Sequence, residues 1–164
     1  MRSRWLVWFA AISGTTACAQ SGEPAACAAD AAAFSQVSDM LGAHCGSLDC
    51  HGQAGRPLRL YSGRGLRLSR DDVSGHGGTR NAEHAANLLA VTALEPELTC
   101  EVLAAAGDDP ERLSLVRKAT GAEHHVGGEV LGRKSPGRTC LLSWLAGQRD
   151  VTACELALES ERPQ

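Results

Sequence analysis

Apolar residues recur at helical spacing near the start of the chain, after an alanine-rich stretch without large side chains. Phe34, Val37 and Leu41 lie three or four positions apart, which is the period of one face of an α-helix. Asp30 precedes them and can cap the first turn with its carboxylate. The pattern predicts a helix over residues 30–44 that ends at the first of two nearby cysteines.

Helical spacing returns over residues 79–106. Leu88, Val91 and Leu94 form one stripe, and a second stripe begins after Pro96. Proline has no backbone N–H and fits the first turn of a helix. We therefore expect two consecutive helices in this region rather than one long one.

Three shorter elements are predicted in the last third of the chain. Pro110 follows an aspartate and begins a short helical piece. Ser135 can cap a helix that runs to Leu145 and is ended by Gly147. Asp150 can cap a last helix that continues to about residue 159.

Only residues 58–68 alternate apolar and polar side chains, around Gly63 and Gly65. Such alternation predicts a short β-hairpin. Residues 71–79 are glycine-rich and predict a loop. The fold class is therefore mainly α, a small helical domain with a short β-hairpin insertion.

The first residues have the organisation of an export signal. Arg2 and Arg4 precede about ten apolar residues, too few to span a bilayer as a helix. Residues 1–17 are therefore predicted to be a signal peptide of the lipoprotein type. Small residues before Cys18 favour lipidation of that cysteine, and ordinary cleavage after Ala19 is the alternative.

Removal of residues 1–17 leaves fourteen Lys and Arg against nineteen Asp and Glu, a formal net charge of −5. This acidic balance argues against nucleic acid and anionic lipid surfaces as partners. Residues 18–33 indicate a flexible tether, and residues 34–160 suit one domain, since domains commonly run to about 100–150 residues. We expect an exported protein, either a lipoprotein anchored on the periplasmic side or periplasmic, whose membrane contact is its N-terminal lipid.

Cys45, Cys50 and His51 form a C-x4-C-H motif. Two close thiols followed directly by a histidine indicate covalent haem attachment, because the thiols can bond to two vinyl groups of one porphyrin while the imidazole binds the iron as proximal ligand. The usual motif has two residues between the cysteines, and wider loops occur in some c-type cytochromes. A structural disulfide between the two cysteines is the main alternative in an exported chain, but it leaves His51 without a role.

Three segments resemble the cytochrome-c-like domain of the planctomycete type, found in bacterial exported proteins. Residues 34–52 resemble its opening, and the stretch from Ser114-Leu115 through Lys118 and Gly121 to the H-x-G-G motif at 125–128 resembles its "S-L…K…G…H-x-G-G" segment. Residues 140–147 resemble its closing W-[IL]-x-x-G helix. The resemblance covers roughly residues 34–147 and implies a small, disulfide-supported cytochrome-c-like domain.

The resemblance also implies a ligand set for one haem c. His51 would be the proximal ligand and His125 of the H-x-G-G motif the distal one, with His124 as runner-up. The two glycines of that motif would let backbone approach the porphyrin closely. Met40 is expected in the core. An iron with two histidine ligands implies electron transfer with exported redox partner proteins rather than catalysis, so we do not expect an enzyme.

The remaining cysteines suggest disulfide bonds. If Cys45 and Cys50 carry haem, Cys140 and Cys154 flank a turn that can bring two helices together, which leaves Cys27 for Cys100. The sequence alone does not decide this connectivity.

Two other functions stay open at this point. One is a haem-less, disulfide-stapled lipoprotein that acts as a binding or structural module. The other is a zinc site formed by Cys45, Cys50, His51 and His125, which would be a tetrahedral set. It is the weaker of the two, since exported thiols tend to oxidise.

Overall fold

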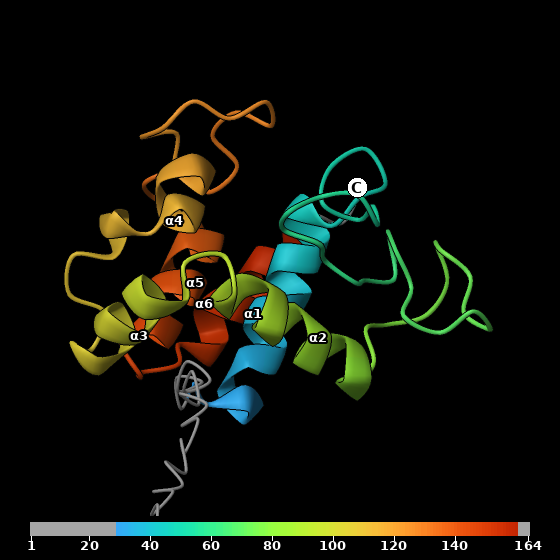
Figure 1. Cartoon of the computed structure of the whole chain (residues 1–164), viewed down its shortest axis with the longest axis horizontal. Helices are drawn as coiled ribbons and strands as arrows, with labels where there is room; N and C mark the ends of the chain where they lie inside the picture. Colours follow the sequence, from blue (N-terminus) through green and yellow to red (C-terminus); the bar gives the residue numbers. More distant parts are fainter. Residues whose placement is uncertain (1–28, 161–164) are drawn as a thin grey trace, which may run out of the picture.

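The computed structural model describes residues 29–160. This part of the chain folds into helices around a single core and contains no β-strand, which confirms the mainly α prediction (Figure 1). The elements in chain order are α1 (Ala31–Cys45), α2 (Asn81–Thr92), α3 (Pro96–Ala104), the short 3-10 helix η1 (Pro110–Arg112), α4 (Ser114–Ala119), α5 (Pro136–Leu145) and α6 (Val151–Glu159).

Local capping explains where several helices begin. The side chains of Asp30, Ser135 and Asp150 each accept hydrogen bonds from backbone N–H groups two or three positions further on, at 2.9–3.2 Å. These bonds satisfy donors that the first turn of a helix leaves without partners. Pro96 occupies the first turn of α3, so the expected division of residues 79–106 into two helices is confirmed.

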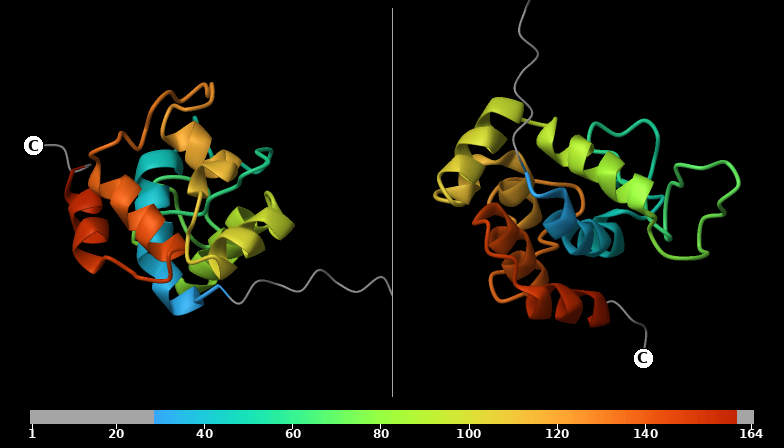
Figure 2. Two further views of the ribbon diagram at one scale, coloured as in Figure 1. Left: turned by 90° about the vertical axis from the view of Figure 1, so that its left-hand side faces the viewer. Right: turned by 90° about the horizontal axis from the view of Figure 1, so that it is seen from below.

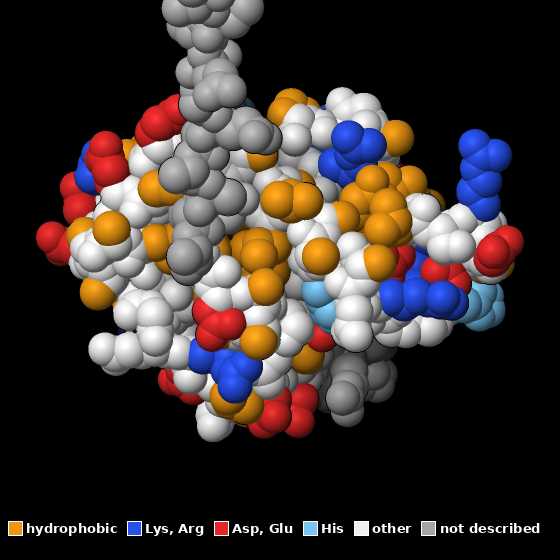
Figure 3. Space-filling model, turned by 60° about the horizontal axis from the view of Figure 1, so that its bottom comes forward, with side chains coloured by type: hydrophobic (Ala, Val, Ile, Leu, Met, Phe, Trp, Pro, Cys, Tyr) orange, Lys and Arg blue, Asp and Glu red, His pale blue; other side chains and the backbone are white. Residues whose placement is uncertain are grey.

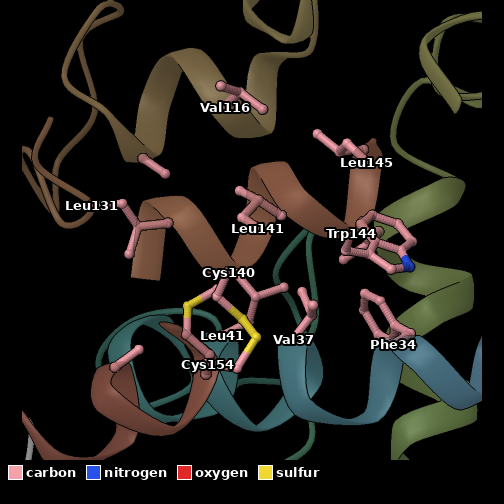
Figure 4. Packing of buried hydrophobic residues seen from close by; sticks show 14 of the residues in the cluster. Phe34, Val37, Leu41, Val116, Leu131, Cys140, Leu141, Trp144, Leu145 and Cys154 are labelled. Carbon is pink, nitrogen blue, oxygen red and sulfur yellow. A yellow bond between two sulfur atoms is a disulfide. The ribbon is translucent and has the colours of Figure 1, made fainter. Parts of the chain in front are cut away.

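The core lies between α1, α5 and α6. Phe34 of α1 faces Trp144 of α5, with their rings 4.9 Å apart, and Val37 and Leu145 are buried in the same cluster (Figure 4). Met40 is fully buried in the same core, as predicted. A large apolar side chain that leaves water completely contributes about 1.5–3 kcal/mol to folding, so this cluster sets the positions of the helices.

A disulfide between Cys140 and Cys154 joins α5 to α6 and confirms the predicted pairing. The turn between the two helices contains Gly147 in the left-handed region, at φ +68°, where glycine carries no steric penalty. Closing a loop of this size stabilises a fold by about 3 kcal/mol in the chain-entropy model. Cys100 is also disulfide-bonded, and its expected partner Cys27 lies outside the described residues.

Two long loops extend from the helices. Residues 46–80 connect α1 to α2 and are drawn in cyan to green in Figure 1; residues 120–135 connect α4 to α5 and are drawn in orange beside α4 in Figures 1 and 2. In place of the predicted hairpin, the first loop contains a single β-bridge between Tyr61 and Leu66.

Within residues 29–160, no helix is long and apolar enough to cross a membrane. The predicted signal peptide, Cys18 and most of the predicted tether lie outside the described residues. On the face shown in Figure 3, acidic and basic side chains are interspersed among apolar ones.

Candidate functional site

A cavity of about 220 Å³ opens where the end of α1, the loop after it and the α4 region meet. Its walls are mostly apolar and include two imidazoles. Mostly apolar walls with a few placed polar groups are typical of sites for small molecules and cofactors. The lining residues are Cys45, His51, Pro57, Leu58, Leu94, Ser114, Leu115, Lys118, Ala119, His125 and Val130.

The C-x4-C-H motif folds back onto the end of α1. Cys45 is the last residue of the helix, and its carbonyl accepts a hydrogen bond from the His51 N–H at 2.9 Å. The four intervening residues form a compact turn, which is closed by a hydrogen bond from the Cys50 N–H to the Ser47 carbonyl at 3.0 Å. The longer spacing is therefore accommodated locally, and the histidine still lies beside the helix end. Cys45 lines the cavity, whereas Cys50 lies in the turn next to it; both are thiols.

Three glycines make this turn possible. A Cβ on Gly52 would lie 2.2 Å from the Gly46 carbonyl oxygen, and one on Gly65 would lie 1.9 Å from the same oxygen. Both distances are far below van der Waals contact, so the backbones can approach this closely only because no side chains intervene. We call Gly46, Gly52 and Gly65 the glycine junction.

His51 is held in one tautomer by the backbone of the same loop. Its Nδ1 lies 2.9 Å from the Leu58 carbonyl oxygen. Because a carbonyl can only accept, Nδ1 carries the hydrogen and Nε2 has a free electron pair. Burial lowers the pKa of His51, the Leu58 bond acts against this, and the charges of His125 and Arg56 lower the pKa further. The ring is thus kept neutral, the form that binds metals.

His125 lies across the cavity on the loop between α4 and α5. Its Nδ1 is buried and has no hydrogen-bond partner within residues 29–160. A buried polar nitrogen without a partner is costly and calls for an explanation. A role of this ring as a ligand would supply one.

The two rings lie 5.8 Å apart between centroids, and their planes are within 9° of parallel. Two imidazoles that bind one metal ion through nitrogens at about 2.0–2.1 Å would have centroids about 6 Å apart. Offset aromatic pairs also fall in a range of about 4.5–7 Å. The apolar cavity and the fixed tautomer of His51 therefore carry more weight than the spacing alone.

The other histidines lie elsewhere. His124 is exposed. The Nε2 of His44 lies 3.1 Å from the Ala157 carbonyl oxygen, and that of His84 lies 4.0 Å from an Asp39 carboxylate oxygen. Among the histidines proposed from the sequence, the fold brings His51 and His125 together and leaves His124 outside the cavity.

No group of three or more His, Cys, Asp or Glu side chains in the described range could hold a metal ion. The four side chains of the zinc alternative are therefore not assembled into a tetrahedral set. A haem iron needs only two axial ligands from the protein, and the paired imidazoles, the adjacent thiols and the apolar walls fit that group.

Parts of the site had no counterpart in the sequence-based prediction. The Leu58 carbonyl is a backbone group, so its role could not be predicted from residue type. Helix α4 was also missed, although Leu115 and Ala119 are spaced four residues apart and could have indicated a helical face. Leu94 was assigned only to a helical stripe, yet it lines the cavity.

Comparisons of this chain with protein-family models, with curated proteins and with solved structures found no match.

Proposed function

We propose that this protein is an exported c-type monohaem electron-transfer protein. Cys45 and Cys50 would carry the haem thioethers, and His51 and His125 would be the proximal and distal ligands. The observation that carries the proposal is an apolar cavity beside a C-x4-C-H turn, lined by His125 and by His51, whose tautomer the Leu58 carbonyl fixes. When bound, a haem supplies a one-electron couple at its iron.

The residues of the chain contribute binding, orientation and exclusion of water. The Leu58 carbonyl fixes the ring of His51 and leaves Nε2 available, as backbone carbonyls commonly do for metal-binding histidines. Leu58, Leu94, Leu115 and Val130 supply apolar walls, which lower the local dielectric and favour a tightly bound, poorly hydrated group. With an imidazole on each side, electron transfer to exported redox proteins fits the site better than catalysis.

The test is expression in a host with c-type maturation machinery, followed by a haem stain on a denaturing gel and an absorption spectrum. We expect covalent, low-spin haem in the wild type and none in a Cys45→Ser/Cys50→Ser double variant. His125→Ala should lose the low-spin spectrum, and His124→Ala, a change at the exposed neighbour, should keep it. A colourless wild-type protein would reject the proposal and favour the haem-less, disulfide-stapled module.

We also propose that the protein is anchored by a lipid on Cys18, on the periplasmic side. The support is the charged and apolar order of residues 1–17 and the small residues before the cysteine. Metabolic labelling with a fatty-acid analogue should mark the wild type but not Cys18→Ser. Equal labelling of both proteins would reject the anchor.

A further inference from the structure

The two imidazoles of the site are held by unequal means. His51 makes a hydrogen bond through its ring at 2.9 Å to the Leu58 carbonyl. Two hydrogen bonds also fix its backbone. The His51 N–H donates to the Cys45 carbonyl at 2.9 Å, and the His51 carbonyl accepts from the Leu60 N–H at 2.8 Å. Moving this ring would break a partly buried hydrogen bond and disturb the chain on both sides of it.

His125 has no comparable attachment within the described part of the chain. Its ring makes no hydrogen bond there, and its Nδ1 is buried without a partner. Gly127 lies beside the ring: a Cβ at that position would lie 2.8 Å from the His125 Cε1 and 3.2 Å from its Nδ1. No hydrogen bond within the described residues therefore fixes the orientation of the ring.

The loop around His125 can move at little cost. Val126, the next residue, is already 99% exposed. Its side chain therefore buries no apolar surface that would be lost if the segment moved. The local backbone bond is a short turn, from the Gly128 N–H to the His125 carbonyl at 2.9 Å. Segments with few buried contacts and short-range hydrogen bonds open most readily in a fold.

We propose that His125 is a displaceable ligand, so that the site accepts a small neutral axial ligand on the His125 side. This inference rests on the proposed haem function. In the exchange, the bond between the iron and a ring nitrogen of His125 breaks, with its electron pair returning to the imidazole, and the incoming ligand donates its own pair; no oxidation or reduction takes place. Leu94, Leu115 and Val130 form apolar walls, which favour a neutral ligand over an anion; the Lys118 ammonium, which also lines the cavity, is paired with the Glu123 carboxylate at 3.1 Å.

The probe is carbon monoxide for the reduced protein, followed by absorption spectroscopy on the full haem-loaded chain. Wild type should start low-spin and six-coordinate and should bind carbon monoxide. Gly127→Ala crowds the ring of His125 and should tighten binding of carbon monoxide by about tenfold, a change of about 1.4 kcal/mol in binding free energy.

His125→Ala removes the competing ligand and should bind carbon monoxide still more tightly, and added imidazole should restore its low-spin spectrum. Gly55→Ala is the matched control, because a Cβ there meets nothing within 4 Å; its affinities should equal those of the wild type.

The outcomes separate the two proposals. A colourless protein rejects the haem function and this inference with it. A six-coordinate haem protein that does not bind carbon monoxide rejects only the inference. Equal carbon monoxide affinity in wild type and His125→Ala would also overturn it, because His125 would then not compete with the probe.

Discussion

The loop of residues 46–80 and the loop of residues 120–135 each bring one histidine to the same cavity, but they are stabilised in opposite ways. The first is held from inside. Glu83 of α2 is 1% exposed and binds Arg67 of this loop at 2.9 Å, while the buried amide of Asn87 bonds to the Tyr61 N–H at 2.7 Å and to its carbonyl at 2.8 Å. The glycine junction then packs the loop directly against the end of α1.

The second loop is held mainly at its base and at its surface. The N–H groups of Val130 and Leu131 bond to the Ala119 carbonyl at 3.0 and 2.8 Å. The segment that carries His125 is flanked by Glu123, which pairs with Arg117 at 2.8 Å and Lys118 at 3.1 Å, and these side chains are more than a third exposed. Exposed ion pairs contribute little to stability. The comparison indicates that the side of the cavity formed by residues 46–80, near the cysteines, is held more firmly than the side formed by residues 120–135.

The largest expected effect is at Glu83. Glu83→Ala removes the closest carboxylate partner of the buried Arg67 guanidinium and leaves it only the more distant Asp72 carboxylate at 3.7 Å; breaking a buried pair costs about 3–5 kcal/mol. Urea unfolding should show this loss, whereas Glu155→Ala, at an exposed site on α6, should not change the midpoint. A Glu83→Ala protein as stable as the wild type would mean that the first loop is not held by this pair.

The same carboxylate predicts a dependence of stability on pH. Burial acts to raise the pKa of Glu83, but hydrogen bonds from the Arg80 N–H, the Arg67 side chain and the Leu68 N–H outweigh it and lower the pKa below its ordinary value of 4.5. The stabilisation is therefore fully present above that value and is lost as pH falls through the lower folded-state pKa. Unfolding free energies measured from neutral pH to about pH 3 should fall more steeply for the wild type than for Glu83→Gln.

A smaller effect is expected in the glycine junction. In Gly65→Ala the new Cβ would meet the Gly46 carbonyl oxygen at 1.9 Å, so the backbone must shift, at a cost of about 1–3 kcal/mol. Under the proposed function, the yield of attached haem should fall as well, because the turn that links Cys45 to Cys50 moves. Gly78→Ala serves as control, since a Cβ there has open space. Equal stability and haem yield in the two variants would contradict the tight packing of the first side.

The smallest effect is expected at Glu123. Hydrogen bonds from Arg117 and Lys118 lower the pKa of this exposed carboxyl, yet Glu123→Gln should leave the urea midpoint unchanged. Hydrogen exchange should instead become faster for amides of residues 121–128 and stay unchanged in residues 46–68. Glu101→Gln, which breaks the exposed pair with Arg112, should alter neither loop. Faster exchange in both loops would show that they are coupled and not independently held.

The sequence by itself determined the features that depend on neighbouring residues. Asp30, Ser135 and Asp150 cap the helices predicted for them, because a cap acts on N–H groups only two or three positions away. The bridge between Cys140 and Cys154 could also be predicted, since a short turn separates two cysteines on adjacent helices. His51 and His125 could be named as candidates from their motifs, but their distance could not.

Only the tertiary structure decided how those candidates relate in space. The approach of His51 to His125 joins residues that α2, α3 and α4 separate in the chain, and it follows from how these helices pack. The burial of Glu83 depends on Arg67 folding back over α2, although an exposed glutamate in a first helical turn would look the same in sequence. Local patterns specify where helices start and stop. The cavity, and the unequal support of its two histidines, arise from long-range packing that no local pattern encodes.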